Sequence, residues 1–141
     1  MQVYISGALT HVPNLDELRI LYEELGAVCQ AFGLSPYIPH KYTDPQNNPN
    51  IAPSEVYSRD RAAVESSALL LAHVTLPSTG VGQEIEIAHQ KGIPILLLYE
   101  KGSEPSRMVR GNPSVVGEII FSTYEEAKAK LAEWLARFRR Q

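Results

Sequence analysis

The chain has 141 residues, of which 44% are hydrophobic and 21% are charged, and its formal net charge is -3. This length is typical of one domain with its own core, so we expect a single domain over residues 1–141. The mild negative charge argues against nucleic acid polymers as partners, and no apolar run approaches the roughly 20 residues that cross a bilayer, so we expect no membrane association.

The cysteine content and the N-terminus bear on location. Cys29 is the only cysteine, so no disulfide can form within the chain, which favours an intracellular protein. Because Cys29 lies in a helical pattern, we interpret it as a small core residue and not as a nucleophile. Residues 3–5 are strand-like and follow no basic segment, which predicts that there is no signal peptide. We therefore expect a cytoplasmic protein.

The first third of the chain predicts two strands, a helix and a long loop. A strand is expected at residues 1–6, and a helix at residues 14–32, where apolar side chains recur with helical spacing. A short second strand is expected at residues 34–38. Residues 40–53 are rich in Pro and Asn, and a loop of this length is typical of a binding loop or a lid.

The rest of the chain continues the alternation of strands and helices. We expect strands at residues 68–74, 95–99 and 118–121, and helices at residues 54–66, from the turn after residue 77 to about residue 91, and from Thr123 onward. This pattern predicts an α/β fold: one doubly wound domain whose parallel, flavodoxin-like or Rossmann-like sheet has about five strands and is covered by helices on both faces.

The most informative segment is Pro-Ser-Thr-Gly-Val-Gly-Gln-Glu at residues 77–84, between a predicted strand and a predicted helix. Ligands bind at the carboxyl ends of strands in open α/β sheets, so the carboxylate of Glu84 would face a ligand. Gly80 and Gly82 would let a small ligand approach the backbone. The alternative interpretation is structural: a strand-to-helix turn with a glutamate in the first helical turn, where the helix dipole favours it.

Three segments together resemble the signatures of the nucleoside 2'-deoxyribosyltransferase superfamily. They are Tyr4-Ile5-Ser6-Gly7, Asp60 and Gly80-Val81-Gly82-Gln83-Glu84. Residues 74–84 and 106–111 are similar to the 2'-deoxynucleoside 5'-monophosphate N-hydrolase branch of that superfamily. The resemblance extends from residue 3 to about residue 112, and it implies cleavage of an N-glycosidic bond.

The resemblance implies a role for each matching residue. Glu84 would attack the anomeric carbon and form a covalent glycosyl-enzyme, Asp60 would protonate the departing base, and Tyr4 would orient the nucleophile. The implied substrate-binding residues are Gly7, Ser78, Gly80, Gly82, Ser106, Met108 and Asn112. This chemistry needs neither a metal nor an organic cofactor, and we predict neither, since His73 and His89 lack partners at metal-ligand spacing.

The branches of this superfamily differ at the 5' end of the sugar. The nucleotide hydrolases carry a Ser and an Arg after the first strand, and the corresponding residues here are Ala8 and Thr10. Ser78 and Ser106 retain the hydrolase pattern, so the phosphate site is half present. Losing a charged contact removes about 1.5–3 kcal/mol of binding, and we therefore expect an unphosphorylated nucleoside as the substrate.

These observations predict a nucleoside 2'-deoxyribosyltransferase, with tolerance of ribonucleosides left open. His11 or Arg110 could replace the missing Arg, which keeps the 5'-monophosphate N-hydrolase as the alternative, and a non-catalytic nucleotide-binding module is a second alternative. The expected partners are nucleosides, nucleobases or nucleoside 5'-monophosphates. The resemblance also implies a homo-oligomer, a dimer or larger, in which residues 106–112 complete the active site of a neighbouring subunit.

Overall fold

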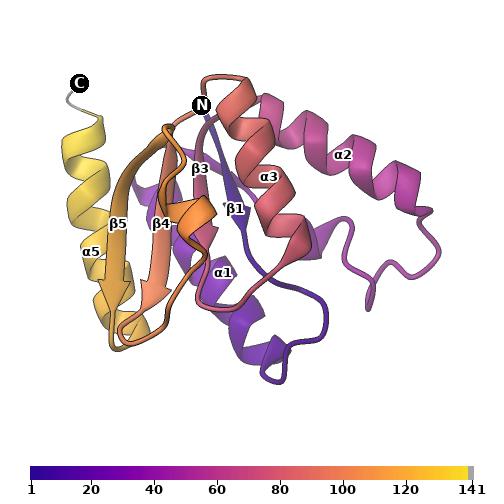
Figure 1. The fold of residues 1–141 in the computed structure, drawn as a ribbon, viewed down its shortest axis with the longest axis horizontal. Helices are drawn as coiled ribbons and strands as arrows, with labels where there is room; N and C mark the ends of the chain where they lie inside the picture. Colours follow the sequence, from indigo (N-terminus) through magenta and orange to yellow (C-terminus); the bar gives the residue numbers. More distant parts are fainter. Residues whose placement is uncertain (140–141) are drawn as a thin grey trace.

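A parallel sheet of five strands lies at the centre of the fold (Figure 1). Its strands are β1 (Gln2–Ser6), β2 (Ser35–Tyr37), β3 (Ser67–His73), β4 (Ile95–Glu100) and β5 (Val115–Phe121). They pair in the order β2-β1-β3-β4-β5, and every pairing is parallel. The computed structural model describes residues 1–139, so residues 140 and 141 of the predicted domain lie outside the described residues. The sheet confirms the predicted fold class.

Helices cover both faces of this sheet, as a doubly wound fold requires (Figure 1). The larger helices are α1 (Leu15–Ala31) and α5 (Tyr124–Phe138) on one face, and α2 (Pro53–Glu65) and α3 (Thr79–Gln90) on the other. Alternate strand residues enter the two cores: Leu69 and Leu71 of β3 pack toward α1 and α5, whereas Leu70 packs toward α2 and α3. Because the sheet is buried on both faces, the sequences of its central strands are continuous apolar runs.

Several local predictions are refined by the structure. The last strand begins at Val115 and not at residue 118, because alternate residues of this edge strand are exposed and weaken its apolar pattern. Two short helices were not predicted: η1 (Pro39–Lys41), which overlaps the start of the predicted loop at residues 40–53, and α4 (Arg107–Arg110). Cys29 is fully buried, and burial raises the pKa of its thiol to about 12, which confirms that it is a core residue.

The order of the strands determines where a ligand can bind. The chain runs outward from β1 to β2 and then crosses to β3, β4 and β5 on the other side, so the direction of winding reverses between β1 and β3. Beyond the carboxyl ends of strands at such a switch point, loops diverge and leave a crevice. Within residues 1–139, none of the helices has the length and apolar character that a membrane crossing needs.

Candidate active site

Helix α3 places Glu84 in its second turn. Ser78 caps the helix by accepting a hydrogen bond from the N–H group of Val81 at 3.3 Å, and the helix itself begins at Thr79. The first turn contains no acidic residue, so the interpretation of Glu84 as a first-turn glutamate is wrong. Four α3 residues that line the more apolar part of the neighbouring cleft share one helical stripe, with the spacing i, i+3, i+4 and i+7: Gly80, Gln83, Glu84 and Ile87.

Two hydroxyl groups of β1 hold the carboxylate of Glu84. The hydroxyl of Tyr4 donates a hydrogen bond to Oε2, and the hydroxyl of Ser6 donates one to Oε1 at 2.7 Å. Residues two apart on a strand face the same side of a sheet, so Tyr4 and Ser6 approach Glu84 together. The predicted contact between Tyr4 and Glu84 is present in the structure. The role of Ser6 was missed, although its spacing from Tyr4 was a signal that could have revealed it.

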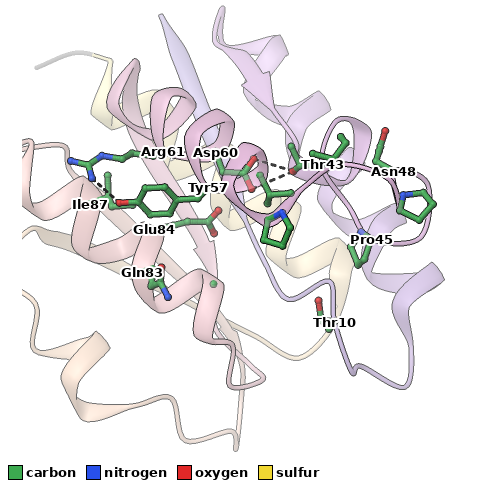
Figure 2. A pocket seen from close by; sticks show the side chains of 15 residues that line it. Thr10, Thr43, Pro45, Asn48, Tyr57, Asp60, Arg61, Gln83, Glu84 and Ile87 are labelled. Carbon is green, nitrogen blue, oxygen red and sulfur yellow. Dashed lines mark hydrogen bonds between the residues drawn. The ribbon is translucent and has the colours of Figure 1, made fainter.

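Asp60 enters the same space from α2, and Figure 2 shows its side chain and that of Glu84 converging there. Thr43 Oγ1 lies 3.0 Å from Asp60 Oδ1, and the hydroxyl of Tyr37 donates a hydrogen bond to the same oxygen at 3.3 Å. Neither Thr43 nor Tyr37 belongs to a segment that resembles the superfamily signatures. The structure therefore brings two carboxylates together, and each is held by two hydroxyl-bearing side chains.

The two carboxylates lie where two lobes of a cleft meet, with volumes of about 480 and 520 Å³. Glu84 and Asp60 line both lobes. Apolar side chains dominate the first lobe: Pro45, Pro49, Ile51, Pro53, Val56 and Ile87. Small and hydrogen-bonding residues are prominent in the second lobe: Gly7, Thr10, His11, Ser78 and Thr79. The loop predicted as a binding loop, residues 40–53, supplies much of the apolar wall.

Two of the predicted glycines contribute to the cleft for different reasons. A Cβ atom at Gly7 would lie 2.3 Å from the ring of Tyr22, so the packing of α1 against β1 requires glycine there. A Cβ atom at Gly80 would meet no atom of the chain within 4 Å. The space above Gly80 is therefore open to the cleft and available to a ligand.

Burial perturbs the proton affinities of both carboxylates. Burial raises the pKa of Glu84 to about 7; the hydrogen bonds from Tyr4 and Ser6 oppose this shift, and the charge of Asp60 adds to it. Burial also raises the pKa of Asp60, against the lowering effects of Thr43, Tyr37 and Arg59. Because the charge of Asp60 is one cause of the raised pKa of Glu84, the two carboxylates form a coupled pair, which suits a site in which one acts as nucleophile and the other as acid.

Four of the predicted substrate-binding residues lie outside the cleft that contains Glu84 and Asp60. An adjoining cavity of about 770 Å³ is lined by Gly82, Ser106, Met108 and Asn112, and it shares Ser78 and Thr79 with the second lobe. Met108 is 87% exposed. These four residues do not line the cleft of Glu84 in their own chain.

No group of three or more His, Cys, Asp or Glu side chains that could hold a metal ion occurs within residues 1–139. That the reaction uses neither a metal nor an organic cofactor stays a prediction.

The fold and the site together define a doubly wound α/β protein with two carboxylates in a cleft at its switch point. No protein-family model matches the chain. A protein of Syntrophotalea carbinolica named "Putative 2'-deoxynucleoside 5'-phosphate N-hydrolase 1" is 34% identical over 96% of this chain and 95% of its own length.

Two solved structures share the fold. A CMP N-glycosidase of Clostridium botulinum superposes with a TM-score of 0.73 at 20% identity, covering 95% of this chain and 99% of its own. A 2-deoxyribosyltransferase of Bacillus psychrosaccharolyticus does so with a TM-score of 0.64 at 13% identity, covering 93% and 96%. This chain therefore belongs to the 2'-deoxynucleoside 5'-phosphate N-hydrolase family of the nucleoside 2'-deoxyribosyltransferase superfamily, whose members act on N-glycosidic bonds; the resemblance seen in its sequence is confirmed.

Proposed function

We propose that this chain hydrolyses the N-glycosidic bond of 2'-deoxynucleoside 5'-monophosphates and releases the free base and 2-deoxyribose 5-phosphate. The observation that carries the proposal is the position of Glu84 and Asp60 at the junction of an apolar lobe and a more polar lobe. The transferase predicted from the sequence is not confirmed. The name of the relative from Syntrophotalea carbinolica favours the hydrolase that was the alternative.

The two lobes match the two ends of a nucleotide. A nucleobase presents flat apolar faces, which suit the lobe walled by prolines, Val56 and Ile87. A phosphate suits the other lobe, where the N-terminus of α3 and the hydroxyls of Thr10 and Ser78 offer hydrogen-bond donors. Ser78 Oγ already accepts from Val81, so its own hydrogen remains free to donate.

The identity of residue 8 does not determine whether the cleft can accept a 5'-phosphate. The expectation of an unphosphorylated nucleoside rested on Ala8 and Thr10 in place of Ser and Arg. Ala8 is buried and does not line the polar lobe, whereas Thr10 and His11 do. Donors from these neighbours can therefore supply contacts that the sequence pattern alone suggested were lost.

The proposed reaction proceeds in two displacements. In the first, a carboxylate oxygen of Glu84 forms a bond to the anomeric carbon while the bond to the base nitrogen breaks, and Asp60 gives its proton to the departing base. The ionised Glu84 stabilises the positive charge that develops on the sugar. In the second, a water molecule attacks the anomeric carbon and releases Glu84, while Asp60 accepts a proton from that water.

Product analysis tests this function. The protein is incubated with 2'-deoxynucleoside 5'-monophosphates and with the matching nucleosides, each with and without a second nucleobase. We expect free base and sugar phosphate as products, and a kcat/KM for the monophosphate at least about tenfold higher, because a charge-assisted phosphate contact contributes about 1.5–3 kcal/mol. Ribonucleotides serve as the comparison for the 2'-hydroxyl. Formation of a new nucleoside would instead establish a transferase, and no product from any substrate would favour a binding module.

The pH dependence of kcat/KM should show the titration of the Glu84–Asp60 pair. Activity requires one proton on the pair, with Glu84 ionised and Asp60 protonated, so kcat/KM should be bell-shaped between pH 4 and 10. Because burial raises the pKa of Glu84 to about 7, one limb of the bell should be centred near that pH. The measurement is kcat/KM at constant ionic strength. A profile that does not change over this range would contradict the assignment.

We also propose that the segment 106–112 serves a neighbouring subunit. It does not line the cleft of its own chain, it carries the exposed Met108, and Arg110 of α4 is held on β5 by a salt bridge to Glu118. An exposed segment fixed in this way could enter the cleft of a second copy in a closed, symmetric oligomer.

Complementation between variants tests the shared site. Glu84→Ala and Ser106→Asp should each be inactive alone. After subunit exchange in a dimer, random pairing should restore about a quarter of the wild-type sites, since half of the dimers are mixed and each mixed dimer contains one intact site. Light scattering gives the oligomeric state. A fully active monomer, or no recovery after confirmed exchange, would show that each chain builds its site alone.

A further inference from the structure

Asp60 is held by two hydroxyl groups from outside the superfamily signatures. Thr43 Oγ1 lies 3.0 Å from Oδ1 and 3.2 Å from Oδ2, and Tyr37 donates to Oδ1 at 3.3 Å. Thr43 is almost fully buried, with 5% of its surface exposed. These contacts come from β2 and from the loop after it, so two separate elements restrain one carboxylate on α2.

Thr43 can satisfy Asp60 in both of its protonation states. A threonine hydroxyl has one hydrogen to donate and can also accept. In addition to Asp60, Thr43 Oγ1 lies 3.3 Å from the carbonyl oxygen of Pro39. The hydroxyl can therefore donate to an ionised Asp60, or donate to Pro39 when Asp60 is protonated. An acid that must lose and regain a proton needs a neighbour of this kind.

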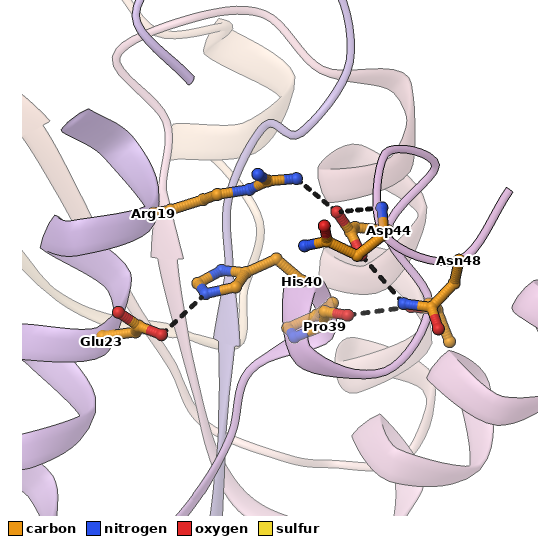
Figure 3. A network of polar contacts seen from close by, with 8 residues as sticks. Arg19, Glu23, Pro39, His40, Asp44 and Asn48 are labelled. Atoms are coloured by element: carbon orange, nitrogen blue, oxygen red, sulfur yellow. Dashed lines mark hydrogen bonds and ion pairs between the residues drawn. The ribbon is translucent and has the colours of Figure 1, made fainter. Parts of the chain in front are cut away.

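The loop that contains Thr43 is held against α1 by a buried ion pair. The side chain of Asp44 is 0% exposed and is paired with Arg19 of α1 (Figure 3). It also accepts hydrogen bonds from the backbone N–H group of Asn47 at 3.2 Å and from the side-chain amide of Asn48 at 3.0 Å. Removing a buried charge partner is costly, so this arrangement resists displacement of the loop. Because Thr43 precedes Asp44, the same contacts determine where the Thr43 hydroxyl lies.

Stacked rings restrain the second donor. The ring of Tyr37 stacks on that of Tyr4 at 5.3 Å between centroids and on that of Tyr42 at 4.9 Å. Tyr4 donates to Glu84, whereas Tyr37 donates to Asp60. A stacked pair of tyrosines therefore supplies one hydroxyl to each of the two carboxylates.

We infer that Thr43 and Tyr37 are positioning residues for Asp60, with Thr43 fastened by the Arg19–Asp44 pair and able to serve Asp60 both with and without its proton. The inference rests on the proposed function, in which Asp60 protonates the leaving base and later accepts a proton from water. It assigns a role to residues that lie outside the superfamily signatures.

The first test compares Thr43→Val, which keeps the shape of the side chain but removes the hydroxyl, with Thr43→Ser, which keeps the hydroxyl. With an ordinary 2'-deoxynucleoside 5'-monophosphate, Thr43→Val should lower kcat by about tenfold or more with little change in KM, whereas Thr43→Ser should stay within about twofold of the wild type. In a single-turnover measurement, which reports the first displacement alone, Thr43→Val should cause little loss with 7-methyl-2'-deoxyguanosine 5'-monophosphate, whose base is already cationic and leaves without a proton. Equal losses on both substrates would indicate a general structural effect and overturn the inference.

The second test is independent of activity. Carbon-13 NMR of labelled aspartate, assigned with Asp60→Asn, gives the pKa of Asp60 directly. Loss of a donor to the ionised form should raise the pKa of Asp60 in Thr43→Val and leave it unchanged in Thr43→Ser. If Thr43→Val does not fold, Tyr37→Phe replaces it and should shift the pKa of Asp60 in the same direction. An unchanged pKa overturns the inference, and a wild type that cleaves no nucleotide overturns only the proposed function.

Discussion

Replacing Glu84 with alanine is expected to lower kcat by about four orders of magnitude, because the covalent route then has no nucleophile and the developing positive charge on the sugar has no carboxylate beside it. The measurement is base release from a 2'-deoxynucleoside 5'-monophosphate. Ser6→Ala is the matched control: it removes one of the two hydrogen bonds to Glu84 and should reduce kcat far less. Near-normal turnover by Glu84→Ala would remove the basis of the proposed mechanism.

Glu84→Gln separates loss of chemistry from loss of folding. Burial raises the pKa of Glu84 in the folded protein to about 7, above the value of 4.5 expected in the unfolded chain. The ionised carboxylate therefore destabilises the folded state, and wild-type stability should fall as the pH rises from about 4.5 through 7. The variant should gain up to about 3 kcal/mol relative to wild type at pH 8 and nothing at pH 4. Denaturant unfolding at the two pH values measures this difference, and equal effects at both would contradict the assignment.

The second large effect is expected for Asp60→Asn. Without a general acid, cleavage of ordinary nucleotides should slow by about 10²- to 10⁴-fold. The cationic 7-methylguanine nucleotide needs no proton at the base, so its first displacement should be nearly unaffected in a single-turnover measurement. Equal losses on both substrates would assign Asp60 a role in binding and not in proton transfer.

The same variant isolates the titration of the nucleophile. With Asp60 neutralised, single-turnover cleavage of the 1,7-dimethylguanine nucleotide, whose base has no N1 proton to lose and stays cationic, should rise with pH and reach a plateau, since only Glu84 must be ionised. Loss of the Asp60 charge removes one of the influences that raise the pKa of Glu84, so the midpoint should lie at or slightly below about 7. A midpoint unchanged by further substitution at Tyr4 and Ser6 would show that another group is responsible.

Much of the fold could be predicted because its signals are local. The apolar runs of β3 and β4 and the helical spacing of α1 each occupy one short stretch of sequence, and their alternation specifies a parallel sheet. Errors were confined to segments whose patterns are weak, such as the half-exposed edge strand β5 and the short helix α4.

The sequence by itself determined which side chains are the candidates for the chemistry, because the resemblance singled out Tyr4, Asp60 and Glu84 by residue type and order. Only the tertiary structure decided what surrounds them. The hydroxyls of Tyr4 and Ser6 reach Glu84 across 80 and 78 positions of sequence, and no local pattern encodes such contacts. Thr43 and the two-lobed cleft likewise depend on where a long loop is fastened to α1, and this long-range packing sets the proton affinities on which the proposed reaction depends.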